Sequence, residues 1–159
     1  MHASSNDQSG VRVFPPAIYL AGLLVGFGIQ WLWPIPIAPA AFAFAVRLFG
    51  IAFLGAWLAL AISAVLTFKK VGTTPHPMRP TTALALAGPY RFTRNPMYLS
   101  FVFMNLGVAL VANALWPVAV IPAIMLIVQR VVIEREEHYL TTKFGQEYIA
   151  FKARVRRWL

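Results

Sequence analysis

Three glutamates, Glu134, Glu136 and Glu137, follow an apolar segment directly, and Arg130 precedes them. On a helix, Glu136 and Glu137 flank one apolar stripe, and Arg130 lies four residues before Glu134 and seven before Glu137. One interpretation is an amphipathic helix on a membrane surface with solvated acids. Grouped carboxylates beside a negatively charged leaflet need partners, however. We therefore interpret this face as one wall of a polar pocket, with Arg130 and Glu137 as candidate catalytic groups.

The stretch GPYRFTRNPMY, residues 88–98, is the candidate for the opposite wall. Together with Pro75, Pro77 and Pro80 earlier in the same loop, its prolines Pro89 and Pro96 rule out a long helix and hold the backbone extended. At membrane depth the free N–H and C=O groups must then bind protein or ligand. Arg91 and Arg94 are candidate partners of the glutamates, or alternatively anchors to anionic lipid. Tyr90 and Tyr98 could enclose a ring, although tyrosines at this level are more often interfacial. Such a pocket suits a zwitterionic or amino-bearing small ligand.

Several site classes are excluded or disfavoured by the residues present. The chain has no cysteine, so disulfides, thiol nucleophiles and Cys-ligated metals are excluded. His2, His76 and His138 are scattered, so we expect no metal site. The net charge of +9 does not indicate nucleic-acid binding, because the basic residues lie at the ends of apolar runs, where contact with membrane lipids explains them.

The elements that position these groups are predicted to be membrane helices. Among the 159 residues, 59% are hydrophobic and 12% charged, and the runs 13–46, 48–68 and 95–129 contain no charged residue. Each run reaches the roughly 20 apolar residues that cross a bilayer. We expect an all-α integral membrane protein of one domain, residues 1–159, with two N-terminal spans in 1–70 and the cofactor-binding catalytic part in 71–159.

Four spans are expected. The first covers about 16–33 and the second 41–68; the third and fourth, 97–111 and 115–128, are short and form a hairpin within the membrane. An amphipathic cytoplasmic helix follows from residue 131. This topology places Arg12, the 69–94 loop and the C-terminal tail on one side, which the positive-inside rule assigns to the cytoplasm. Both termini should therefore be cytoplasmic, at an inner or cytoplasmic membrane.

The two polar segments resemble a known family. GTTPHPMRPTTALALAGPYRFTRNPMYLS, followed by a short apolar hairpin and EREEHYLTTKFGQEYIAFKARVRRW, is similar to the isoprenylcysteine carboxyl methyltransferases and the related phospholipid N-methyltransferases. The likeness covers residues 72–158. It implies an all-helical membrane methyltransferase that takes S-adenosylmethionine in a cytoplasmic pocket and methylates a lipophilic small molecule or lipid. The family's cofactor positions fall on Thr82, Ala83, Leu84, Ala85, Tyr90, Asn95 and Glu136, beside which we place Tyr98.

One departure from the prenylcysteine enzymes concerns the acceptor. Four residues before the matching glutamate, those enzymes carry an arginine that holds the substrate carboxylate, whereas this chain has Val132. Arg130 or Arg135 is a candidate replacement. A carboxylate, an amine or a thiol therefore stays open as the methyl acceptor. Two other classes also stay open, an NADPH-dependent membrane reductase of related fold and a non-catalytic scaffold.

Overall fold

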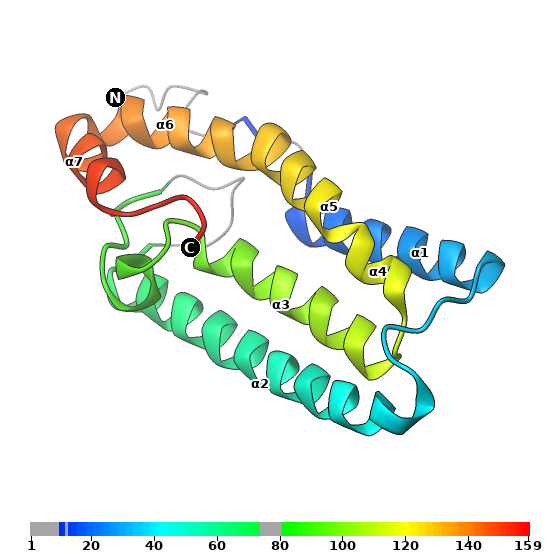
Figure 1. Cartoon of the computed structure of the whole chain (residues 1–159). Helices are drawn as coiled ribbons and strands as arrows, with labels where there is room; N and C mark the ends of the chain where they lie inside the picture. The colour runs from blue at the N-terminus through cyan, green and yellow to red at the C-terminus, as the bar shows by residue number, and fades with distance from the viewer. Residues whose placement is uncertain (1–9, 12, 74–80) are drawn as a thin grey trace.

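The computed structural model describes residues 10–11, 13–73 and 81–159, and this part of the chain is helical with no β-strand (Figure 1). Arg12, Arg79 and the loop prolines Pro75, Pro77 and Pro80 lie outside the described residues. The elements are α1 Pro15–Leu32, α2 Ala40–Lys70, the 3-10 turn η1 Gly88–Arg91, α3 Pro96–Val111, α4 Leu115–Ala119, α5 Ile121–Val128, the π-helical turn η2 Gln129–Ile133, α6 Glu134–Phe144 and α7 Gln146–Arg154.

Within the described residues, three helical segments are long and apolar enough to cross a membrane, Pro15–Leu32, Ala40–Lys70 and Leu115–Phe144. Pro96–Val111 is apolar but shorter. The prediction of an all-α integral membrane protein is thus confirmed, while only three of the four expected spans meet this length. The second helix of the expected short hairpin also differs from the prediction, because it is longer. There the helical path continues from Leu115 to Phe144, because no glycine or proline separates the apolar residues from the charged ones before Gly145.

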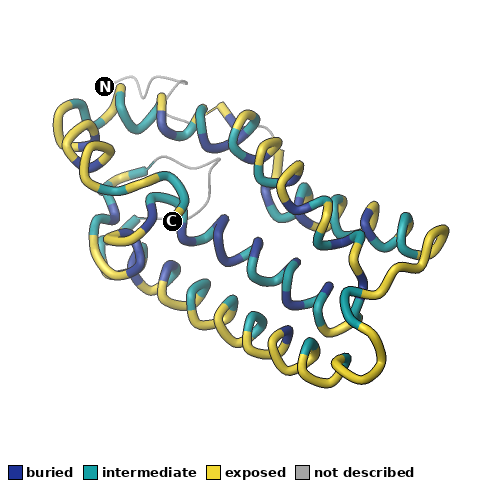
Figure 2. Tube along the Cα trace, in the orientation of Figure 1, coloured by how far each residue is buried: buried dark blue, intermediate teal, exposed yellow. Residues whose placement is uncertain are grey.

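Helices α2 and α3 approach each other closely at two glycines. A Cβ on Gly50 would lie 2.7 Å from the backbone nitrogen of Val111, and one on Gly107 would lie 2.8 Å from the Leu54 side chain. Small residues permit this approach between apolar helices. The outward face of α2 stays exposed along its length (Figure 2), and its Phe44 is 71% exposed. An exposed apolar face of this kind suits lipid.

The opposite ends of the helices are joined by hydrogen bonds between turns. Asn113, at a φ of 52°, donates its side-chain N–H to the Ala38 carbonyl at 2.8 Å and accepts from the Ala38 N–H at 3.0 Å. Trp116 Nε1 donates to the carbonyl of Trp33 at 2.8 Å, and the Trp33 side chain is exposed. The two turns at this end, residues 33–40 and 112–116, carry no charged residue, and exposed tryptophans of this kind are common at membrane interfaces.

The core around α1, α3 and α5 fixes the start of α3. Tyr19 is 1% exposed, and its hydroxyl donates to the carbonyl of Tyr98 at 3.0 Å. Its ring packs on Phe101 with the centroids 5.3 Å apart. Val128 and Val132 are fully buried in the same cluster. The first turn of α3 and the turn before α6 are therefore held in fixed positions.

Candidate functional site

One cavity is lined by residues from the end of α2, the start of α3, α6 and α7. Figure 1 shows these elements at one end of the molecule. The cavity is open on one side, and its empty space, including open solvent at the mouth, is about 830 Å³. Its walls are mostly apolar and aromatic, with a small set of charged and polar side chains, which is typical of ligand sites. The lining residues are Phe68, Thr81, Ala83, Leu84, Ala85, Tyr90, Arg94, Asn95, Met97, Tyr98, Glu136, Glu137, Tyr139, Leu140, Tyr148 and Phe151.

Glu136 faces the start of α3. The Tyr98 hydroxyl donates a 2.8 Å hydrogen bond to Glu136 Oε1. Tyr98 is 8% exposed and is itself fixed by Tyr19, so the position of this donor is well defined. Within the described residues, no lysine or arginine pairs with Glu136. Its carboxyl group therefore has hydrogen-bonding capacity left for a ligand.

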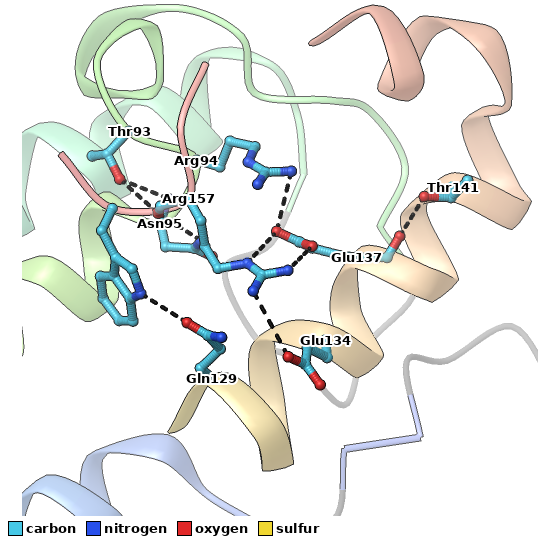
Figure 3. Close-up of polar contacts among 9 residues, drawn as sticks. Thr93, Arg94, Asn95, Gln129, Glu134, Glu137, Thr141 and Arg157 are labelled. Carbon is cyan, nitrogen blue, oxygen red and sulfur yellow. Dashed lines mark hydrogen bonds and ion pairs between the residues drawn. The ribbon is translucent and has the colours of Figure 1, made fainter. Parts of the chain in front are cut away.

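Glu137, by contrast, is held by two arginines from other parts of the chain (Figure 3). Arg157 donates to it twice, from Nε to Oε1 at 3.1 Å and from Nη2 to Oε2 at 2.7 Å. Arg94 Nη1 lies 3.2 Å from Oε1. The side chain of Glu137 is only 7% exposed, and its hydrogen bond raises the pKa of Arg157. Paired, hydrogen-bonded charges are the form in which a carboxylate tolerates burial.

The C-terminal tail, residues 155–159, completes this arrangement. The main-chain carbonyl of Arg157 accepts 3.0 Å hydrogen bonds from Thr93 Oγ1 and Asn95 Nδ2 (Figure 3). The Arg94 main-chain N–H donates to the Arg156 carbonyl at 2.9 Å. Trp158 Nε1 donates to Gln129 Oε1 at 3.1 Å. The tail thus joins the segment before α3 to the turn before α6.

The turn η1 places Tyr90 in the cavity. Gly88 has a φ of 58°, which favours glycine, and an added Cβ would lie 2.7 Å from Thr67 Oγ1 at the end of α2. Tyr90 is 6% exposed, and its ring meets Phe68 edge to face at 5.3 Å. Burial raises the pKa of Tyr90, so its phenol stays neutral at physiological pH.

Of the ten residues predicted as catalytic or cofactor-binding, eight line this cavity and two do not. The lining includes Ala83, Leu84, Ala85, Tyr90, Asn95, Tyr98, Glu136 and Glu137. Thr82 lies outside the lining and hydrogen-bonds instead to Thr73 and to the Gly72 carbonyl. Arg130 also lies outside it, with a side chain 67% exposed and Nη1 3.5 Å from Glu134 Oε1.

The structure also shows the surroundings of Val132, which stands where the prenylcysteine enzymes carry the substrate-binding arginine. Val132 is fully buried in the apolar core. Arg135, the other candidate replacement, is exposed and donates to the Gly10 carbonyl. Neither Arg130 nor Arg135 lines the cavity, whereas Arg94 lines it and Arg157 reaches it through Glu137. The sequence left Arg94 open between ligand partner and lipid anchor and gave no signal for Arg157, one of several basic residues in a charged tail.

Comparison with known proteins bears on this site. The phospholipid methyltransferase family matches residues 45–147, which include most of the cavity lining. An uncharacterized protein of Haemophilus influenzae is 44% identical over 64 residues, or 40% of this chain and 100% of that protein. No solved structure matches the chain. The family match supports a membrane methyltransferase and does not favour the reductase or the scaffold.

Proposed function

Because this chain belongs to the phospholipid methyltransferase family, we propose that it transfers a methyl group from S-adenosylmethionine to a lipophilic acceptor. The observation that carries the proposal is the meeting of two distant segments at one cavity. Ala83–Ala85, Tyr90 and Asn95 enter it from the loop before α3, and Glu136 enters it from α6. These two segments are the ones that resemble the family.

The charges of the cavity fit this cofactor. S-adenosylmethionine carries an ammonium and a sulfonium, and Glu136 offers a carboxylate that lacks a cationic partner among the described residues. Tyr98 holds that carboxylate in place at 2.8 Å. Around it, the aromatic rings of Tyr90, Tyr148 and Phe151 line the walls and suit a flat heterocycle or a sulfonium. Glu136 and Tyr98 would thus hold the cationic end of the cofactor.

When bound, the cofactor supplies a methyl group on a positively charged sulfur, which is already activated for transfer to a nucleophile. The chain's own contribution is then positioning and exclusion of water rather than acid–base chemistry. Phe68, Leu140 and Phe151 make the walls apolar. Asn95 is fixed by its hydrogen bond to Arg157, and Tyr90 by its contact with Phe68. Glu137 serves here by organising Arg94 and Arg157; Arg130 has no part because it lies outside the cavity.

The acceptor and the orientation in the membrane belong to the same proposal. Lys69, Lys70, Arg91 and the basic tail lie at the cavity end of the helices, and the opposite turns have no charge. By the positive-inside rule we propose that the cavity faces the cytoplasm, with α3 and the helical path Leu115–Phe144 as a hairpin in the membrane. A lipid could reach the cavity from the bilayer, and its nucleophile could be a carboxylate, an amine or a thiol.

Labelled cofactor tests this function. Purified protein in detergent is incubated with methyl-tritiated S-adenosylmethionine and a lipid extract of the expression host, and the organic phase is counted. We expect wild-type protein to transfer label and Glu136→Gln to lose most of the transfer. Glu147→Gln, which alters an exposed glutamate of α7, is the matched control and should transfer normally. Equal transfer by wild-type and Glu136→Gln protein would refute the role of this cavity.

A further inference from the structure

Helices α5 and α6 are joined by the π-helical turn η2, which comes directly before the glutamates of the cavity. A π turn hydrogen-bonds residues five apart, whereas an α-helix bonds residues four apart, so the π turn accommodates one residue more. Successive residues of an α-helix are rotated by about 100° around its axis. The extra residue in η2 therefore decides which side chains of α6 face the cavity.

Without this turn, Arg135 would face the side to which Val128 points. Val128, the last residue of α5, is fully buried. In an uninterrupted α-helix, the residue seven positions after Val128, which is Arg135, lies on the same face, and the residue nine positions after it, Glu137, lies on the opposite face. In the structure Arg135 is exposed and Glu137 is buried. The buried face of α6 is thus one residue out of register with that of α5.

The π turn is held in place on two sides. Val132 and Ile133, its last two residues, are both fully buried in the core cluster that contains Val128. Trp158, from the C-terminal tail, packs against the same cluster and donates from Nε1 to Gln129 Oε1 at the first residue of the turn, at 3.1 Å. The turn is therefore anchored in the fold at both of its ends.

The rotation gives two adjacent residues of opposite charge separate partners. Glu136 faces the cavity, where it accepts the 2.8 Å hydrogen bond from Tyr98. Arg135 points away from the cavity and donates to the carbonyl of Gly10 at 3.3 Å. A guanidinium in the position of Glu136 would repel a ligand that carries an ammonium and a sulfonium.

We propose that η2 is a register device, whose one extra residue directs Glu136 instead of Arg135 into the cavity. Single π turns within α-helices are frequent at functional sites. The inference rests on the proposed function in treating Glu136 as the group that holds the cationic end of the cofactor. The rotation of α6 itself is a separate statement and is measurable without a cofactor.

Changes in the length of the turn test the device. Deleting Arg130, an exposed residue of η2 outside the cavity, makes Glu136 the seventh residue after Val128. The path can then be α-helical with Glu136 still facing Tyr98, so we expect S-adenosylhomocysteine to bind within about threefold of the wild-type affinity in calorimetry. Inserting one alanine after Arg130 turns Arg135 towards Tyr98 instead. This insertion should weaken binding about tenfold or more, the range of a lost charged hydrogen bond.

A rescue separates register from general damage to the fold. In the insertion variant, Arg135→Glu supplies a carboxylate at the position that faces Tyr98 and should recover most of the lost affinity. The same substitution in the chain of natural length is the control, and it should not raise the affinity because Arg135 points outward. An insertion that acts only by disturbing the fold would leave the rescued variant as weak as the insertion alone.

Thiol cross-linking measures the register without any cofactor. The chain has no cysteine, so a pair of introduced cysteines provides the only thiols. The full chain in detergent is treated with a short bismaleimide, and cross-linked protein is identified by its mobility on a gel. We expect Tyr98→Cys to link with Glu136→Cys and not with Arg135→Cys, both at natural length and after deletion of Arg130. In the insertion variant the preference should be reversed.

The outcomes distinguish the two proposals. The expected cross-links without binding of S-adenosylhomocysteine by the wild-type protein uphold the register device and contradict the proposed cofactor. Preferred linking of Tyr98→Cys with Arg135→Cys at natural length overturns the device, as does an insertion variant that keeps the wild-type pattern of cross-links. If neither length variant folds, the two cysteine pairs at natural length decide.

Discussion

Arg157 and Glu137 are joined by two hydrogen bonds, 3.1 and 2.7 Å long, between the last residues of the chain and helix α6. The same arginine accepts through its main-chain carbonyl from Thr93 and Asn95, directly before α3. One tail residue therefore fixes both halves of the cavity. The site depends on the C-terminal tail as well as on the two segments that carry the family resemblance.

Arg157→Ala should destabilise the protein, because it leaves the buried Glu137 with only the ion pair to Arg94. Loss of hydrogen bonds to a buried charge costs about 1–3 kcal/mol. The measurement is the apparent melting temperature in detergent. Arg156→Ala, which removes an exposed side chain from the same tail and keeps the main-chain bond from Arg94, is the control. Equal melting temperatures for the two variants would show that the Arg157 pair does not stabilise the fold.

Gly88→Ala should destabilise the turn η1, which carries Tyr90, although Gly88 itself does not line the cavity. The new methyl group would meet Thr67 Oγ1 at 2.7 Å in a backbone conformation that already strains alanine. Left-handed strain costs of order 1–3 kcal/mol, and the contact adds to it. Gly72→Ala is a matched control with a φ of 70° and no atom within 4 Å of the added Cβ. Thermal unfolding should show a larger loss for Gly88→Ala, and the reverse order would contradict the close contact between η1 and α2.

Gly50→Ala tests the packing that brings the end of α2 to the start of α3. Its Cβ would lie 2.7 Å from the Val111 nitrogen and 2.9 Å from the Gly107 carbonyl oxygen, both backbone atoms. The two helices must then separate, and overpacking of this kind costs about 1–3 kcal/mol. Gly55→Ala in the same helix meets no atom within 4 Å and should unfold at the wild-type temperature or slightly above it. Unfolding of both variants at the wild-type temperature would argue against this helix contact.

The polar pattern of the chain was enough to predict much of this cavity. The prolines and tyrosines of 88–98 and the glutamates after the apolar run predicted two facing walls, and Tyr98 and Glu136 do meet. Arg157 could not be predicted, because its role depends on a tail that leaves α7 at Val155 and returns to α3. The continuous path to Phe144 was missed because the change in composition at residue 131 does not end the helix, which passes through the π-helical turn η2 into α6. Arg130 was selected by spacing alone, which does not say which face of the helix looks outward.

Tyr98→Phe should weaken cofactor binding while leaving the fold intact. The variant removes the donor to Glu136 Oε1 and keeps the ring that packs in the core. A lost hydrogen bond of this kind costs about 1 kcal/mol, or about fivefold in affinity. Tyr148→Phe removes another hydroxyl from the cavity, one without a hydrogen bond within the described residues. Titration with S-adenosylhomocysteine should separate the two variants, and a larger loss in Tyr148→Phe would speak against Glu136 as the main ligand group.

The most direct test of the central claim is calorimetric titration of the purified wild-type protein with S-adenosylhomocysteine, alongside Glu136→Gln. If the cavity between α3 and α6 is the cofactor site, the wild-type protein binds in a saturable manner and Glu136→Gln loses about tenfold or more in affinity at an unchanged melting temperature. Absence of saturable binding by folded wild-type protein would contradict the claim, as would binding that is indifferent to Glu136→Gln.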